Sequence, residues 1–191
     1  MKKHIVLFAS GNGTNTQNII KHFQNSKHAQ VVCVLSNNKN AQVLDRSKAL
    51  NIEALSFTKA EMLAPQNLLS LLKQYKPDLI VLAGFLLKFP KIIIDAFPNR
   101  VINIHPALLP KYGGKGMYGH HVHKAVVENK ETSSGITIHY VNTQYDKGEV
   151  IFQKKISITP QDTPQDVANK VQQLEHQWLP KVIEDVLTKP H

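Results

Sequence analysis

The chain has 191 residues, of which 42% are hydrophobic and 19% are charged, enough for one globular domain with a sizeable core. It lacks a run of about 18 apolar residues, which argues against a membrane span. A glycine loop directly follows the short apolar start, which argues against a signal peptide, so we expect a cytoplasmic protein. Cys33 is the only cysteine, which excludes an intrachain disulfide and a zinc site built on cysteines.

The formal net charge is +9, a balance that is often found in nucleic-acid-binding proteins. Only Arg46 and Arg100 are arginines, however, and arginine is the usual reader of base edges. The lysines are scattered along the chain rather than clustered. A general attraction for small anionic molecules fits this charge at least as well.

The first predicted elements are a strand over residues 4–9, a glycine loop over residues 10–15 and a helix over residues 16–23. This order is typical of a phosphate site, because N–H groups at a helix start point at the anion and glycine permits close approach. The third glycine of the dinucleotide motif is missing after Gly11 and Gly13, so the loop does not predict an NAD site. A plain turn between strand and helix remains the alternative.

The next predicted strands cover residues 30–35, 52–57 and 79–83, and they alternate with predicted helices at 41–50, 60–75 and 91–97. The strand at 79–83 is apolar on both faces, which is typical of a parallel sheet covered by helices on both sides. The segment that follows, residues 84–90, is unusually apolar for a loop. It forms either the wall of a pocket for a flat aromatic ligand or a segment packed under a helix.

Residues 101–105 predict a central strand that ends at Pro106, because proline cannot continue a central strand. Asn103 and His105 lie two residues apart, so their side chains point to one face. They also lie at the carboxyl end of the strand, where open α/β sheets bind ligands. An amide and an imidazole there would bind an oxyanion and transfer a proton. The alternative is that two polar residues cap the strand.

A glycine-rich segment, residues 113–119, predicts a flexible loop that would close as a lid. The helix predicted at 120–129 begins with His120, His121 and His123, but no carboxylate or cysteine lies at a spacing that would complete a metal site. Strands at 135–141 and 150–158 are predicted to pair antiparallel, with Asp146 in the loop between them. A long helix begins at Thr163 and carries Glu175 within the span of its apolar stripe.

Together these elements predict a single Rossmann-like α/β domain over residues 1–191. Its central sheet would be mostly parallel, with helices on both faces and an antiparallel C-terminal portion. From its spacing alone, Asp146 is more typical of a turn residue than of a catalytic acid.

Four segments, at residues 10–15, 82–85, 103–110 and 146–148, resemble those of the phosphoribosylglycinamide formyltransferases, a family of folate-dependent enzymes. The resemblance covers nearly the whole chain. It implies transfer of a formyl group from 10-formyltetrahydrofolate to the amine of 5′-phosphoribosylglycinamide in purine biosynthesis, without a metal. It also implies small-molecule partners rather than nucleic acid or membrane, in a monomer or a homodimer.

The resemblance also implies roles for individual residues. Asn103, His105 and Asp146 would be catalytic, and Asp146 would raise the pKa of His105 and orient it. The ribonucleotide would contact Gly11, Asn12, Gly13, Thr14, Asn15, Gln172 and Glu175. The folate would contact Leu86, Leu87, Lys88, Phe89, Asn103, Val141, Asn142, Thr143, Gln144 and Tyr145, and His121 and His139 would lie behind these contacts. Residues 1–100 would then mainly bind the ribonucleotide, and residues 101–191 would carry catalysis and folate binding.

Other functions remain as alternatives. Methionyl-tRNA formyltransferase and formyltetrahydrofolate deformylase share the catalytic residues, but we expect a further domain in each. A basic nucleotide-binding module without chemistry would explain the charge, but not the matched Asn103, His105 and Asp146.

Overall fold

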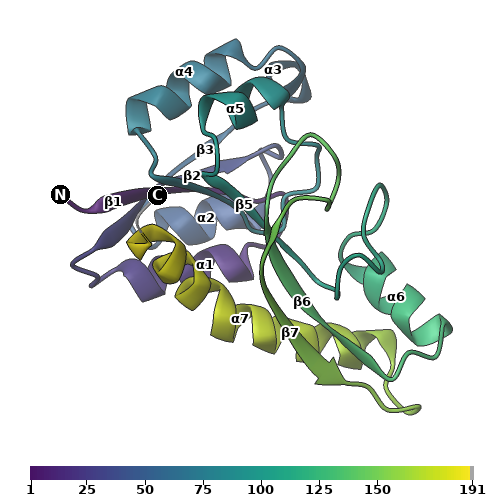
Figure 1. Ribbon diagram of the computed structural model, residues 1–191. Helices are drawn as coiled ribbons and strands as arrows, with labels where there is room; N and C mark the ends of the chain where they lie inside the picture. Colours follow the sequence, from purple (N-terminus) through teal and green to yellow (C-terminus); the bar gives the residue numbers. More distant parts are fainter. Residues whose placement is uncertain (190–191) are drawn as a thin grey trace.

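The structure is a computed structural model that describes residues 1–189; the last two residues of the predicted domain, Pro190 and His191, lie outside it. Its middle layer is a seven-stranded sheet with the order β3-β2-β1-β4-β5-β6-β7 (Figure 1). The parallel strands are β1 (Lys3–Phe8), β2 (Ala29–Ser36), β3 (Glu53–Ser56), β4 (Leu79–Leu82) and β5 (Val101–His105). Strands β6 (Ser133–Tyr140) and β7 (Val150–Ser157) pair antiparallel, as the sequence predicts.

Helices cover both faces of the sheet (Figure 1). One face carries α3 (Lys59–Leu63), α4 (Gln66–Tyr75) and α5 (Lys91–Ala96). The other carries α1 (Thr14–Phe23), α2 (Gln42–Lys48) and the long α7 (Pro164–Thr188), with α6 (His120–Glu128) packed against α7. No helix within residues 1–189 is both long enough and apolar enough to cross a bilayer.

The strands bury side chains on both faces, and this produces two hydrophobic cores. In β1, Ile5 and Leu7 belong to the core under α1, α2 and α7, whereas Val6 and Phe8 belong to the core under α3, α4 and α5. All four side chains are fully buried. Consecutive side chains of a strand point to opposite faces, so a strand that is apolar throughout needs helices on both sides. The predicted fold class is therefore confirmed.

The predicted single helix over residues 60–75 is wrong, because the segment forms two helices that are separated at Ala64 and Pro65. Ala64 leaves the helical region, with φ of −117° and ψ of 72°. A residue before proline is disfavoured in the α region, and proline supplies no N–H to continue the ladder. The remaining predicted elements agree with the structure to within two residues at each end.

Candidate active site

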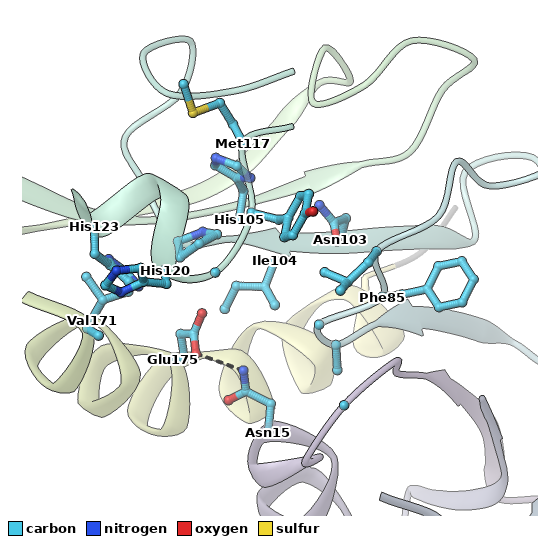
Figure 2. A pocket seen from close by; sticks show the side chains of 18 of the residues that line it. Asn15, Phe85, Asn103, Ile104, His105, Met117, His120, His123, Val171 and Glu175 are labelled. Atoms are coloured by element: carbon cyan, nitrogen blue, oxygen red, sulfur yellow. Dashed lines mark hydrogen bonds between the residues drawn. The ribbon is translucent and has the colours of Figure 1, made fainter. Parts of the chain in front are cut away.

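The site lies at the carboxyl edge of the sheet, where the strand order reverses between β1 and β4. The loops that follow these strands are joined by two hydrogen bonds. The Ser10 N–H donates to the Gly84 carbonyl at 3.0 Å, and the Leu86 N–H donates to Ser10 Oγ at 3.0 Å. Between these loops, the end of β5 and α7 lies a cavity of about 610 Å³ (Figure 2).

The glycine loop after β1 runs directly into α1. Gly13 is the N-cap residue, with φ of +75°, a conformation that favours glycine. A Cβ atom at Gly13 would also overlap the side chain of Val43 in α2, so only glycine fits here. Gly13 has no side chain to cap the helix, and the Thr14 N–H makes only a long hydrogen bond of 3.4 Å to Asn12 Oδ1. The first turn of α1 can therefore donate to a ligand, and N–H groups at a helix start favour anions.

The last helix contributes two residues to the same end of the cavity. Gln172 Nε2 donates to Thr14 Oγ1 at 3.1 Å, and Asn15 Nδ2 donates to Glu175 Oε2 at 2.8 Å (Figure 2). Burial raises the pKa of Glu175, and the hydrogen bond from Asn15 only partly offsets this effect. The residues predicted to bind the ribonucleotide thus come together, although Thr14 and Gln172 are 158 residues apart along the chain.

Asp146 lies among the other residues that we predict to be catalytic. Its Oδ2 atom lies 3.6 Å from His105 Nδ1 and accepts a hydrogen bond from the Gly114 N–H at 2.9 Å. Its Oδ1 atom lies 3.5 Å from Asn103 Nδ2. The structure therefore brings the amide, the imidazole and the carboxylate of the predicted set into one small volume.

Asp146 itself has a positive φ of 52°, which aspartate tolerates better than most residues with a side chain. The turn that contains it is held close to β6, since a Cβ atom at Gly148 would overlap the Tyr140 carbonyl. Burial raises the pKa of Asp146, but the nearby imidazoles of His139 and His105 and the hydrogen bond from the Gly114 N–H outweigh burial and lower it overall. Asp146 is therefore a carboxylate at neutral pH.

His139 orients Asn103. The β5–β6 register places these residues opposite each other, and Asn103 Nδ2 lies 3.1 Å from His139 Nε2. His139 Nδ1 lies 2.8 Å from the Tyr140 carbonyl, which only accepts, so the proton of the neutral ring is assigned to Nδ1. Nε2 then accepts a hydrogen bond from the Asn103 amide. This contact turns the Asn103 amino group, rather than its carbonyl, toward Asp146.

His105 is buried, and its Nε2 atom donates to the Tyr112 carbonyl at 2.7 Å. Burial lowers the pKa of His105, and the negative charge of Asp146 opposes this effect without cancelling it. The charge of Asp146 thus raises the pKa of His105, as we expect, but burial outweighs this contribution. The resting His105 is neutral, with Nδ1 directed at the carboxylate.

The apolar segment after β4 combines the two alternatives that its sequence left open. Phe85 and Phe89 are buried, and each ring packs edge-on against Phe8. Leu87, Lys88 and Phe89 line a smaller pocket of about 60 Å³ next to the main cavity. That pocket also contains further residues predicted to bind folate, namely Asn103, Val141, Asn142, Gln144 and Tyr145. Leu86 lines the main cavity, and Thr143 lines a separate depression of about 420 Å³ that also contacts Leu87, Lys88 and Phe89.

The glycine-rich segment and α6 also contribute to the main cavity, and two of the three histidines at the start of α6 face it. Lys115 and Met117 line the main cavity, as do His120 and His123, whereas His121 is exposed and packs against Tyr118. The three-residue spacing of His120 and His123 would have placed both on one face of a helix. Within residues 1–189, no group of histidine, cysteine and acidic side chains is arranged to hold a metal ion.

Residues 3–183 match the model of a protein family described as formyl transferase. The chain belongs to the formyl transferase family. It is 38% identical to the chloroplastic phosphoribosylglycinamide formyltransferase of Arabidopsis thaliana, over 95% of this chain and 64% of the plant protein. It is 32% identical to the phosphoribosylglycinamide formyltransferase of Bacillus subtilis, over 98% of this chain and 95% of the bacterial protein.

The fold agrees with this family. The solved phosphoribosylglycinamide formyltransferase of Coxiella burnetii superposes with a TM-score of 0.84 and 37% identity, over 96% of this chain and 86% of that one. The chain spans 64% and 60% of the lengths of the two plant relatives, from Arabidopsis thaliana and Vigna unguiculata, which is less than two thirds. The family resemblance inferred from the sequence is confirmed.

Proposed function

We propose that the chain transfers the formyl group of 10-formyltetrahydrofolate to the amine of 5′-phosphoribosylglycinamide, which yields formylglycinamide ribonucleotide and tetrahydrofolate in purine biosynthesis. One observation carries this proposal. Asn103, His105 and Asp146 converge where the main cavity meets the smaller apolar pocket, and Asn103 and Asp146 line both. The names of the bacterial and plant relatives support the choice of substrates.

The two substrates would approach this point from opposite sides. The phosphate of the ribonucleotide would accept hydrogen bonds from the N–H groups between Gly11 and Asn15. Gln172 and Glu175 would contact its ribose from α7. The flat pteridine of the donor would lie between the segment Leu86 to Phe89 and the loop Val141 to Tyr145, with Asn103 between the two substrates.

The reaction forms one bond from the amine nitrogen to the formyl carbon and breaks the bond from that carbon to N10 of the folate. In the tetrahedral intermediate, the Asn103 amino group donates a hydrogen bond to the oxyanion, an interaction worth about 3 kcal/mol in comparable sites. Asp146 is ionised and accepts the proton that the attacking amine loses. His105 Nδ1 receives this proton across the 3.6 Å separation and delivers it to N10 as the bond breaks.

The test is an absorbance assay of donor conversion by the purified chain, with and without 5′-phosphoribosylglycinamide. We expect conversion that depends on the amine and yields one formylated product for each tetrahydrofolate. Equal conversion without the amine would instead identify a hydrolase. The variant Asn103→Ala should keep its fold and lose turnover, because its side chain is held at the site and does not belong to either hydrophobic core.

A further inference from the structure

A short backbone segment, residues 111–114, contacts both members of the His105–Asp146 pair, and we call it the clamp segment. The Tyr112 carbonyl accepts a hydrogen bond from His105 Nε2 at 2.7 Å, and the Gly114 N–H donates to Asp146 Oδ2 at 2.9 Å. Two backbone groups that are only two residues apart thus hold the imidazole and the carboxylate at their separation of 3.6 Å. A displacement of the clamp segment would therefore disturb both side chains.

The contact with Tyr112 decides which nitrogen of His105 faces the carboxylate unprotonated. A neutral imidazole carries one proton and a carbonyl only accepts, so this contact keeps the proton on Nε2 and leaves Nδ1 free. Without the carbonyl, the charge of Asp146 would favour the opposite tautomer, in which Nδ1 carries the proton. That tautomer has no room at Nδ1 for the proton that the attacking amine loses.

The backbone of Tyr112 adopts an unfavourable conformation at this contact. Its φ of 57° lies in the left-handed region, which a bulky side chain rarely occupies. Such a conformation persists only where the surrounding structure holds it in place. The Tyr112 ring is half-buried against the hydrophobic core under α7, and its hydroxyl donates to Glu131 Oε1 at 2.9 Å. The hydroxyl contact is therefore one of the interactions that hold the carbonyl at His105.

The partner of the hydroxyl, Glu131, lies in the turn between α6 and β6 and does not line the cavity. The same Oε1 atom accepts a hydrogen bond from Lys111 Nζ at 2.9 Å, so one carboxylate binds two consecutive residues of the clamp segment. The Glu131 N–H donates to the Val126 carbonyl at 3.1 Å, which fixes the turn to the end of α6. Glu131 thus connects the clamp segment to a regular helix.

We propose that Glu131 is a positioning residue for formyl transfer, and that it acts through Tyr112 to hold His105 in the tautomer with a free Nδ1. The catalytic part of this inference rests on the proposed function, whereas the tautomer is a property of the protein without substrates. The contacts run from Glu131 Oε1 to the Tyr112 hydroxyl, and from the Tyr112 carbonyl to His105 Nε2. Removal of the hydroxyl and removal of the carboxylate should therefore have the same effect.

The first test reads the tautomer from the ¹⁵N chemical shifts of the His105 ring at neutral pH, without substrates. We expect a protonated Nε2 and an unprotonated Nδ1 in the wild type. Tyr112→Phe, which keeps the packed ring, and Glu131→Ala should both move the proton toward Nδ1. Glu131→Gln should restore most of the wild-type pattern, because its amide oxygen still accepts a hydrogen bond. This measurement needs no formyl transfer, so it tests the inference even if the proposed function fails.

The second test is turnover with both substrates saturating. The loss of one hydrogen bond changes an equilibrium by about fivefold, so kcat should fall about fivefold in Tyr112→Phe and in Glu131→Ala, with both KM values unchanged. The double variant should fall no further than either single variant, because both changes break one contact. Glu128→Ala is the matched control, since Glu128 is the last residue of α6 and pairs with Lys124 at 3.6 Å on the exposed surface.

The proposal is overturned if Tyr112→Phe and Glu131→Ala keep the wild-type tautomer of His105, or if their turnover equals that of Glu128→Ala. Losses that add up in the double variant would also overturn it, because the two side chains would then act through separate contacts. A folded Glu131→Gln protein that loses the tautomer as fully as Glu131→Ala would contradict a connection made by hydrogen bonds.

Discussion

Replacing Asp146 with asparagine removes the charge of this side chain and keeps its shape. Asparagine tolerates the positive φ of 52° as well as aspartate does, and its amide oxygen still accepts the hydrogen bond from Gly114. Alanine would remove the contact to Gly114 as well and would mix two effects. Any loss of turnover in Asp146→Asn therefore reports on the carboxylate charge.

The magnitude follows from the separation of 3.6 Å between Asp146 Oδ2 and His105 Nδ1. Two unit charges at this distance attract each other by about 4–5 kcal/mol at an effective dielectric constant of about 20. Both side chains are largely shielded from solvent, with exposures of 4% for His105 and 12% for Asp146. The variant loses this stabilisation of protonated His105 and also loses the acceptor for the amine proton. We expect kcat to fall by about three orders of magnitude.

The assay is single-turnover formyl transfer with both substrates saturating, so that a change in binding does not mimic a change in chemistry. Thermal unfolding and calorimetric binding of the ribonucleotide serve as controls, and both should stay near the wild-type values. A kcat within tenfold of wild type in a variant that passes these controls would refute the role of Asp146 as the base. The proton would then leave through water or His105 alone.

Three further variants test other parts of the site. Gly148→Ala should reduce both turnover and stability, because its Cβ atom overlaps the Tyr140 carbonyl and the turn that holds Asp146 must shift; wild-type kinetics would contradict this. Burial, together with the charges of His120 and His105, lowers the pKa of His123 from 6.5 to about 4. The neutral His123 side chain therefore contributes about 3 kcal/mol to the free energy of unfolding above pH 6.5, and this stability is lost as the pH falls toward 4. Urea unfolding at pH 7 and pH 4.5 should show a smaller loss in His123→Gln than in wild type, and equal losses would contradict the assignment. Gln172→Ala should raise the KM for the ribonucleotide about tenfold through loss of the contact to Thr14, whereas Gln173→Ala, on the exposed side of α7, should not.

Much of the fold follows from periodicity. Fully apolar strands such as β4 demand helices on both faces, and the alternation in β5 puts Asn103 and His105 on one face. The break at Pro65 also had a local signal, because a proline in the middle of a helical pattern disfavours helix at the residue before it. The leucines that favour a single helix, Leu68, Leu69, Leu71 and Leu72, all follow this proline, so they do not predict helix before it.

The site is less visible in the sequence, because its parts come from segments that only the fold brings together. The spacing of Asp146 is typical of a turn residue, and its catalytic role followed from the family resemblance. Its contacts with His105 and Gly114 depend on a turn that packs on β6 and on a glycine loop 32 residues away. The sequence predicts His121 near the site, whereas the structure places His123 at the cavity and His121 at the surface. These residues are two positions apart on one helix, so a small change in where the helix begins decides which of them faces the cavity.

The antiparallel end of the sheet explains why Asn103 faces the reaction in a defined orientation. In a parallel neighbour, the carboxyl ends of both strands would open into the same crevice. Because β6 runs the other way, His139, the residue before its C-terminal Tyr140, lies beside Asn103, and the Tyr140 carbonyl fixes the His139 tautomer. An amide that is free to rotate would present its carbonyl to the oxyanion for part of the time and repel it. The change in strand direction therefore contributes to preorganisation, which predicts that His139→Ala lowers kcat more than it raises either KM.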